Sequence, residues 1–463
     1  DYLCKARGIK VADKIAIQTM RRHSNSQEPL SGEDLKYDAR ALTLFISAVF
    51  EERIPHEVNV LIPHINRPFQ KGLEINNRRI RCIVKNWDSD FIRVDIDQDA
   101  DEEEYLVRLK DEENHIDHTY LWDLLKEGMQ LNLLDCQVKQ PIITPRLIVV
   151  EPDYLVDISS IAICFTAFGH HPLLYLLNLM KPRANTQATL LGNFAGAALD
   201  DIINSHGKYQ VNETVKSNFR EKALEFCTCP WFDAKKFYTD ANQQAFNLQQ
   251  VVDILFPRTA SQAQMSAFRG ESLYDRKKAI LEPSFVCEAL GIQGRVDLMT
   301  TDCKLLVEQK SGRNMNIETH QVDPGYHSYQ LEPHYVQLLL YYGVLQHNFK
   351  LSNDRVNIRL LYSKYQPQDG LMVVAYYQKL FKEAIEYRNQ LVAASFEIAK
   401  EGFEHALNEF TPEVLNVAGT QDFFYNKYLK PQIEAITEPL HDLSPLEEAY
   451  FCRMMTFVLR EQM

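Results

Sequence analysis

The stretch from Gly294 to Lys310 constrains the fold of this chain more than any other. It reads Gly-Arg-Val-Asp, then a polar turn, then a short aliphatic run that ends in Glu308-Gln309-Lys310. A short apolar run bounded by turn residues is typical of a buried strand, so we expect two antiparallel strands here. Side chains alternate between the faces of a strand, so Glu308 and Lys310 share one face and Gln309 points to the other.

Asp297 lies on the strand before this run and is predicted to reach the face that carries Glu308 and Lys310. Two carboxylates and one ammonium group would then converge where the apolar core ends. Magnesium prefers oxygen ligands and usually keeps several waters beside one or two protein carboxylates. The sequence therefore predicts a site for a hard divalent cation at this edge of the sheet.

These residues resemble the signature of the PD-(D/E)xK nuclease superfamily. Asp297 and Glu308-Gln309-Lys310 match its acidic and lysine positions, and Gly294 with Asp297 resembles the Gly-x-x-Asp form of the RecB-like branch. Gln337 and Tyr341 lie four residues apart and are similar to the Gln-x-x-x-Tyr helix of the same branch. Each piece alone is common by chance, whereas all three in this order and spacing are fairly specific.

The resemblance implies an α/β fold in which a mixed sheet is flanked by helices in the order α-β-β-β-α-β. We expect this nuclease domain at residues 141–402, with a helical insertion at 207–283. Alternating apolar and polar residues predict a preceding small β-rich, barrel-like domain at 56–140. Apolar residues at helical spacing predict helical segments at residues 1–55 and 403–463.

The resemblance also implies hydrolysis of phosphodiester bonds with Mg²⁺ or Mn²⁺. Asp297 and Glu308 are the expected metal ligands, with the backbone carbonyl of Gln309 as a third. Glu288, at the start of the hairpin, is expected to help hold a second ion or a metal-bound water. Lys310 is assigned first to orienting the attacking water and stabilising charge in the transition state, and second to acting as a general base.

Gln337 and Tyr341 complete the expected catalytic set, in which they contact the substrate backbone or brace Lys310. His334, on the same stripe of the helix, is expected to be structural rather than a ligand. The plain alternative for the three charged residues is an ion pair at a strand edge. For the helix, the alternative is ordinary amphipathic packing.

The sequence departs from the RecB-like pattern in two places. Relatives place a histidine ligand four residues after a glycine of the first core helix, and from Gly192 that count reaches Gly196. Either the metal is held without an imidazole or Asp200, one turn further on, takes its place; alternatively, Asp200 lies on an exposed polar edge. Several relatives also hold an iron-sulfur cluster with one cysteine near the position of His170 here and three after the core. Only Cys452 follows the core, so we expect no such cluster.

Composition sets further limits. The 463 residues are too many for one ordinary core, and 9 cysteines without a disulfide-like framework indicate an intracellular protein, cytoplasmic if bacterial. No apolar run is long enough to span a membrane, so no membrane association is expected. The net charge of −13 is unfavourable for binding a polyanion, although much of the acid lies within residues 95–104. That run is interpreted as a solvated turn and not as a calcium loop, because Ala100 stands where the loop needs glycine.

Two regions outside the core carry weaker signals. Small barrels of the OB type often hold single strands, so the β-rich domain either binds nucleic acid or is structural. Within the insertion, Trp231 and the neighbouring Phe and Tyr residues are interpreted as core and not as a stacking platform for bases.

The expected function is that of a metal-dependent DNA nuclease acting on single strands or flaps, as the nuclease part of a larger repair or replication nuclease-helicase. The passage from Leu443 onward is similar to the one that joins nuclease and motor in flap-processing members of that group. No Gly-x-x-x-x-Gly-Lys-Ser/Thr motif occurs, so a covalently linked helicase would lie outside this chain, and we expect a monomer. Two alternatives remain: an inactive DNA-binding module of the same fold, and a nuclease that acts on duplex DNA or RNA.

Overall fold

The computed structural model describes residues 16, 18–20, 22–23, 30–50, 79–96, 105–181, 184–205, 209–268, 270–323, 326, 328–351 and 356–462. The chain divides into two compact units, of which the first comprises Asp1–Leu73 with Gln98–Ala100 and the second Glu74–Asp97 with Asp101–Met463. Residues 56–78 of the expected β-rich domain, and the acidic run from residue 97 to 104, lie outside the described residues.

The longest described element of the first unit is helix α3, Gly32–Phe50. It coincides closely with the helix predicted from the spacing of apolar residues between Asp34 and Glu51. Its start is a reciprocal cap, in which the Asp34 carboxylate accepts from the Ser31 N–H and the Ser31 hydroxyl accepts from the Asp34 N–H. This part of the chain shows no cluster of chemically reactive side chains among its described residues.

The β-rich module of the second unit is a seven-stranded sheet in the order β7-β8-β3-β2-β1-β6-β9. Its strands are β1 Arg79–Trp87, β2 Phe91–Asp95, β3 Tyr105–Arg108, β6 Gln130–Leu134, β7 Gln137–Lys139, β8 Ile142–Thr144 and β9 Leu147–Val150. Neighbouring strands are antiparallel except β3 and β8. The sheet continues to Val150, beyond the expected boundary at residue 140. The two edge strands, β7 and β9, do not pair with each other within the described part of the module, so the sheet there is open and not a closed barrel.

A five-stranded mixed sheet carries the residues that were predicted to be functional. Its order is β13-β16-β17-β18-β19, with bounds Ala279–Leu281, Leu298–Thr300, Leu305–Lys310, Asn357–Tyr362 and Leu371–Val373. The expected antiparallel pair is confirmed, since Leu298 of β16 lies opposite Val307 of β17. β17 and β18 are parallel, which makes the sheet mixed.

A single bent hairpin connects this sheet to a three-stranded one. The second sheet has the order β10-β15-β14, with bounds Val156–Asp157, Ile292–Arg295 and Ser284–Cys287. β13 continues into β14 and β15 into β16, so both arms of the hairpin cross from one sheet to the other. At the crease the Glu282 N–H donates to the Asp297 carbonyl at 3.0 Å, and the Val296 N–H donates to the Pro283 carbonyl at 3.3 Å. Asp297 therefore lies at the bend.

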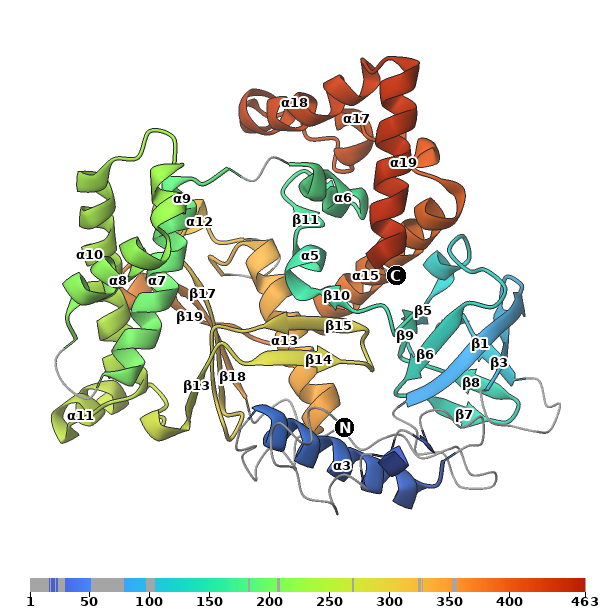
Figure 1. The fold of residues 1–463 in the computed structure, drawn as a ribbon, viewed down its shortest axis with the longest axis horizontal. Helices are drawn as coiled ribbons and strands as arrows, with labels where there is room; N and C mark the ends of the chain where they lie inside the picture. Colours follow the sequence, from blue (N-terminus) through green and yellow to red (C-terminus); the bar gives the residue numbers. More distant parts are fainter. Residues whose placement is uncertain are drawn as a thin grey trace. The chain divides into compact units, whose positions relative to one another are not determined.

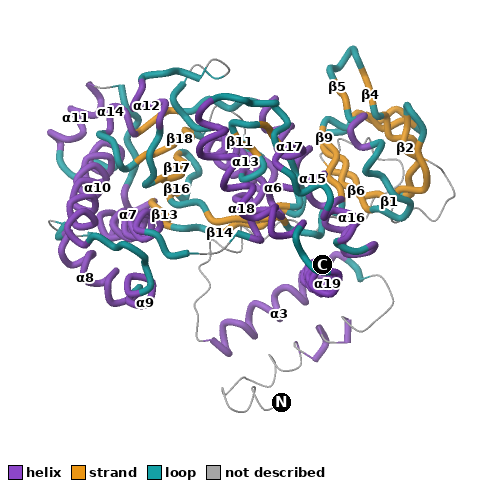
Figure 2. Tube along the Cα trace, turned by 90° about the horizontal axis from the view of Figure 1, so that it is seen from above, coloured by secondary structure: helices purple, strands orange, loops and turns teal. Residues whose placement is uncertain are grey.

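Helices cover both faces of the five-stranded sheet (Figures 1 and 2). α7 (Gln187–Asn204) and α10 (Ala234–Leu255) pack on one face, against Leu305 and Val307. α13 (Glu332–Phe349) packs on the other face, against Leu306, and α15 (Gln378–Glu401) packs against α13. α10 and the edge strand β13 both come from the range expected to be an insertion, so this range contributes directly to the layered core. The second unit is thus mixed α/β with mixed sheets.

The remaining elements are shorter or lie in the C-terminal region. A separate apolar core joins α6 to the end of α15 and to the helices that follow it. None of the described helices is both long enough and apolar enough to cross a membrane. Their bounds are β4 Lys110–Asp111, β5 Ile116–Asp117, η1 Thr119–Leu121, α5 Ile158–Ala162, β11 Phe165–Thr166, β12 Gly169–His170, α6 Leu173–Met180, α8 Val211–Glu221, α9 Ala223–Cys227, α11 Ala260–Phe268, η2 Arg276–Lys278, α12 Met315–Thr319, α14 Pro367–Gly370, α16 Glu404–Leu407, α17 Pro412–Leu415, η3 Tyr425–Leu429, α18 Lys430–His441 and α19 Pro445–Gln462.

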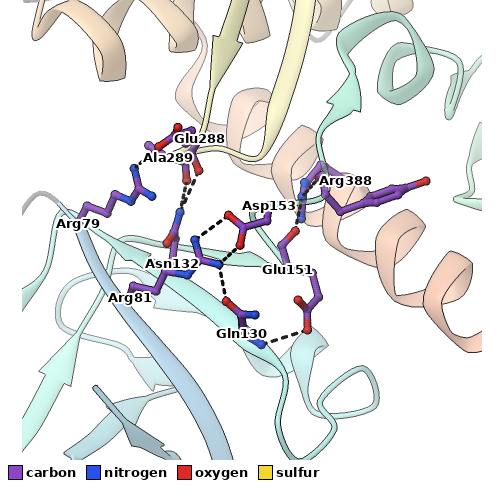
Figure 3. Close-up of polar contacts among 10 residues, drawn as sticks. Arg79, Arg81, Gln130, Asn132, Glu151, Asp153, Glu288, Ala289 and Arg388 are labelled. Atoms are coloured by element: carbon purple, nitrogen blue, oxygen red, sulfur yellow. Dashed lines mark hydrogen bonds and ion pairs between the residues drawn. The ribbon is translucent and has the colours of Figure 1, made fainter. Parts of the chain in front are cut away.

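One buried arginine on α15 joins the β-rich module to the bent hairpin (Figure 3). Arg388 is fully buried and donates to the carbonyls of Glu151 at 3.0 Å, Tyr154 at 2.6 Å and Gly291 at 3.2 Å. Gly291 has a φ of +61°, and a Cβ there would lie 2.3 Å from Arg388 Nη2. The glycine at the hairpin turn therefore makes room for the guanidinium.

Candidate active site

The end of β17 presents two charged side chains to α13, as the alternation of a strand requires. Lys310 Nζ donates to Glu308 Oε1 at 2.8 Å and to Gln337 Oε1 at 2.8 Å. Gln309 points to the opposite face, where its Nε2 donates to Ser363 Oγ at 2.7 Å. The structure thus brings Glu308, Lys310 and Gln337 together and shows Gln337 bracing the lysine, one of the two roles expected for it.

Asp297 meets the same strand from the crease of the hairpin. Its Oδ2 accepts a hydrogen bond from the Gln309 N–H at 2.5 Å. The N–H and C=O of one residue in an extended strand point to the same side, so the Gln309 carbonyl also faces the Asp297 side. The next carbonyl, of Lys310, points the other way and accepts from the Ser363 N–H at 2.9 Å. Asp297, Glu308 and the Gln309 carbonyl are therefore arranged around the end of β17, on the side of β16.

The two buried carboxylates share one nearby ammonium group, that of Lys310. Glu308 is only 2% exposed, and its Oε2 has no hydrogen-bond partner among the described residues. Burial, together with the charge of Asp297, raises the pKa of Glu308 to about 8, although Lys310 opposes the shift. Burial also raises the pKa of Asp297. A buried carboxylate oxygen without a partner is costly, so this site favours a bound proton or cation.

Gly294 and Tyr341 belong to two different sequence motifs that meet in space. The Tyr341 hydroxyl donates to the Arg295 carbonyl at 2.7 Å, which fixes α13 to β15. A Cβ on Gly294 would lie 3.0 Å from Tyr341 Cε1 and 3.3 Å from the Cβ of Ile158. The glycine therefore lets the tyrosine ring pack directly on the strand, one helical turn from Gln337.

At the start of α13, His334 contacts a tyrosine. Its Nδ1 lies 2.9 Å from the Tyr362 hydroxyl, which also accepts from the Leu331 N–H at 3.1 Å. Burial lowers the pKa of His334 to about 4, and the charge of Lys310 adds to this effect, so the imidazole is neutral at pH 7. A neutral, partly buried imidazole held by a tyrosine fixes the start of α13 beside the lysine.

The structure does not bring Glu288 into this cluster. Ser284 pairs with Arg295 and Cys287 with Ile292, so Glu288 lies at the far end of the β14–β15 hairpin. There it is exposed and forms an ion pair with Arg79 at 3.6 Å, while its carbonyl accepts from Asn132 at 3.0 Å (Figure 3). Glu288 thus contacts the β-rich module and does not join Asp297 and Glu308.

Two further acidic residues lie near Asp297. Glu282 was not identified from the sequence, and Asp200 was named only as a possible substitute for a histidine ligand. Glu282 lies opposite Asp297 at the crease, with a φ of +48°, and pairs with Arg295 at 3.1 Å. Burial and then the charges of Glu282, Asp201 and Asp297 raise the pKa of Asp200 to about 6. Asp200 is thus partly buried and close enough to the cluster to interact with its charges.

Asp200 and Asp201, adjacent residues of α7, differ in their exposure. Asp201 is exposed and accepts a hydrogen bond from the Thr214 hydroxyl, so the exposed-edge interpretation describes Asp201. Asp200 is half-buried instead, and the charges of Glu282 and Asp297 act on it. A Cβ at Gly196 would meet no atom within 4 Å, so there is open space at the position where the resemblance implies a histidine ligand.

The donor set suits a hydrated hard cation better than a closed metal cage. Within the described ranges, no group of three or more His, Cys, Asp and Glu side chains could hold a metal ion. The donors at the site are two carboxylates and one backbone carbonyl, a set that matches Mg²⁺ or Mn²⁺ retaining several waters. His170 lies between two carboxylates, with its Nε2 2.9 Å from Glu332 Oε2 and its Nδ1 2.7 Å from Glu383 Oε1.

In comparisons with known proteins, no family model and no curated protein matches the chain.

Proposed function

We propose that this chain is a metal-dependent nuclease with a PD-(D/E)xK core that hydrolyses phosphodiester bonds of single-stranded or flapped DNA. The observation that carries the proposal is the meeting of Asp297, Glu308 and Lys310 at the end of β17, where Glu308 Oε2 lacks a partner among the described residues. A strand-edge ion pair alone would not require a second buried acid beside the first. The order of α7, the bent hairpin, β17, α13 and β18 supports the same core.

The residues present fit a divalent cation. Asp297, Glu308 and the Gln309 carbonyl would hold Mg²⁺ or Mn²⁺, and Asp200 would occupy the side from which an imidazole is missing. When bound, the cation supplies neutralisation of phosphoryl charge and activation of a water.

The protein's own residues supply orientation. Lys310 is held by Glu308 and Gln337, which fixes its ammonium group beside the carboxylates. From there it can orient the attacking water and neutralise charge that develops on the phosphoryl oxygens. The hydrogen bond from the Tyr341 hydroxyl to the Arg295 carbonyl holds α13 against the hairpin, so the position of Gln337 relative to Asp297 is fixed.

Cleavage assays with labelled single-stranded and flapped DNA in Mg²⁺, Mn²⁺ or EDTA test the proposal. The wild-type chain should cut in either metal and not in EDTA. Asp297→Ala and Lys310→Ala should each lower the rate by about 100-fold or more, because each removes charge stabilisation at the reacting phosphate. Lys304→Ala, at an exposed lysine near the start of β17, should cut normally.

Asp200 and Asp201 provide a second, matched test. Asp200→Asn should raise the Mg²⁺ concentration for half-maximal cutting by about 10-fold, a typical effect of losing a group that supports a metal site. Asp201→Asn should leave this concentration unchanged, since Asp201 is exposed and bonded to Thr214.

One observation favours a second candidate function, an inactive DNA-binding module: Gly196 offers no ligand in the open space beside α7. Persistent DNA binding without metal-dependent cutting, by wild type and Asp297→Ala alike, would support the module. Duplex DNA and RNA in the same assay separate the third alternative, a nuclease with another substrate.

A further inference from the structure

Trp231 is the most exposed large apolar side chain of the second unit, at 98%. It was expected to belong to the core, and that prediction is wrong. Its backbone lies in the left-handed region, with a φ of +57°. A non-glycine residue in this region is strained, and such strain is retained where the surroundings fix it or function requires it. Full exposure and backbone strain are two independent observations at one residue.

The aromatic core beneath Trp231 is complete without it. Phe219 and Phe226 stack with ring centroids 3.9 Å apart, and Phe226 contacts Phe237 edge-on at 5.2 Å. Phe232, the residue directly after Trp231, packs against Phe226 at 5.3 Å. The expected core role therefore holds for the phenylalanines, and Trp231 points away from a core that has no place for it.

The segment that carries Trp231 is fixed on both sides. Before it, the Thr228 hydroxyl donates to the Leu224 carbonyl at 2.8 Å and accepts from Asn185 Nδ2 at 2.7 Å. After it, Asp233 caps α10 by accepting from the Lys236 N–H at 2.9 Å, and its own N–H donates to Gln187 Oε1 at 2.9 Å. The backbone that carries the indole is thus held in place on both sides, so little backbone entropy is lost on binding.

Helix α7 links this segment to the candidate active site. Gln187, which holds the Trp231 segment, opens α7, and a Cβ on Gly192 would lie 3.2 Å from Oγ of Ser311, the residue that follows Lys310, on the face of the sheet opposite to α13. At 1.5 Å per residue the two contact points are separated by about 8 Å along the helix. Lys235 and Lys236, in the first turn of α10, are exposed beside Trp231 and add positive charge.

We propose that Trp231 stacks on a base of a single nucleic-acid strand whose phosphates pass Lys235 and Lys236 on the way to Lys310. The inference rests on the proposed function and adds to it a strand-binding site outside the cleavage centre. Aromatic stacking suits single strands of any sequence, because each base has an open face, whereas duplex bases are already stacked. The lysines are placed to contact the negatively charged backbone.

Binding of a labelled oligothymidylate to the full chain, in EDTA to prevent cutting, measures the stacking. Trp231→Ala should weaken binding by about 5- to 150-fold, the range for loss of one stacked base. Trp231→Phe should restore most of the affinity, because a ring remains. Trp122→Ala, at a 51% exposed tryptophan of the β-rich module, is the matched control and should bind like wild type. Equal affinities for wild type and Trp231→Ala would overturn the inference.

A glycine variant separates binding from folding. Trp231→Gly removes the indole and accepts the positive φ without strain, so the folded protein should be at least as stable as wild type. Its affinity for the oligothymidylate should nevertheless fall as in Trp231→Ala. A stable Trp231→Gly protein with unchanged affinity would show that the exposed indole serves something other than a single strand, such as a protein partner.

Fluorescence gives a direct signal, because the chain has 3 tryptophans. Trp87→Phe combined with Trp122→Phe leaves Trp231 as the sole reporter, and its emission should be quenched by single strands and not by blunt duplex. Asp297→Ala in this background should abolish cutting and keep the quenching. If the double variant with Asp297 intact shows quenching but no cutting, the catalytic proposal alone is rejected. If it cuts DNA but its emission is not quenched, the strand-binding site alone is rejected.

Discussion

At the scale of single residues, Glu308 shows a conflict between stability and function. Glu308→Gln should raise the unfolding free energy of the metal-free protein by about 1 kcal/mol, because a neutral amide replaces a buried acid beside Asp297 and still accepts from Lys310. Urea unfolding in EDTA measures the change, and cutting should be lost. Glu213→Gln, at an exposed helix position, should change neither the unfolding free energy nor cutting. A Glu308→Gln protein less stable than wild type would contradict this account.

Two glycines provide a paired test of packing. Gly294→Ala places a methyl group 3.0 Å from Tyr341 Cε1, so it should cost about 1–3 kcal/mol of stability and reduce cutting by displacing Tyr341 and α13. Gly196→Ala meets no atom within 4 Å in the interior of α7, so it should stabilise by about 0.5–1 kcal/mol. Thermal unfolding of both variants checks the opposite signs, and two variants of equal stability would contradict them.

The sequence supported some of these residues and missed others for a clear physical reason. Glu308, Gln309 and Lys310 follow from alternation along one strand, which is a local property. Glu282, which the sequence missed, approaches Asp297 because the hairpin bends at its crease, and Asp200, which was named only through the resemblance, does so because α7 packs on the sheet. Neither fact is encoded in local spacing, and the same bend carries Glu288 away from the site.

At the scale of elements, His170 of β12 joins α13 and α15. It bonds to Glu332 at 2.9 Å and Glu383 at 2.7 Å, and Tyr326 donates to Glu332 at 2.5 Å. Burial alone would lower the pKa of His170, but the two carboxylates outweigh burial and raise it to about 9. The folded pKa lies above the ordinary 6.5, so the stabilisation is complete below pH 6.5 and disappears as the pH rises through 9.

His170→Gln tests this interaction. The difference in Tm between wild type and variant should be largest near pH 6 and should shrink as the pH approaches 9, because protonated His170 is then lost in the wild type. His405→Gln, at an exposed residue, serves as the control. A difference that stays constant between pH 6.5 and 9 would contradict an ion-paired role.

Element prediction succeeded where one face of a segment is strongly apolar. The β16–β17 pair and the helical segment that contains α3 were predicted from the pattern of apolar residues, and α13 was predicted from its resemblance to the Gln-x-x-x-Tyr helix. α10 was recognised as helical but assigned to an insertion, because its apolar face, with Phe237, Leu248 and Val251, does not reveal which surface it covers. The structure shows that surface to be the five-stranded sheet.

At the scale of the whole second unit, Arg388 holds two sheets together. Arg388→Ala should cost about 3–5 kcal/mol, since it removes a fully buried side chain and takes the guanidinium donor from the carbonyls of Val150 and Tyr154. The segment after β9 should then become sensitive to limited proteolysis. Lys379→Ala, exposed on the same helix, should change neither property. Unchanged stability and protease resistance in Arg388→Ala would exclude the joining role.

This junction also has a consequence during synthesis on the ribosome. β9 is an edge strand of its sheet, and among the described residues the Val150 carbonyl and N–H bond to the side chains of Arg388 and Asn389, 238 and 239 residues later. At ordinary translation speeds of about 5–20 residues per second, the strand waits roughly 12 to 48 s for them. An open strand edge in a nascent chain invites pairing with a neighbouring polypeptide. Slow elongation between the module and α15 should therefore increase co-translational aggregation.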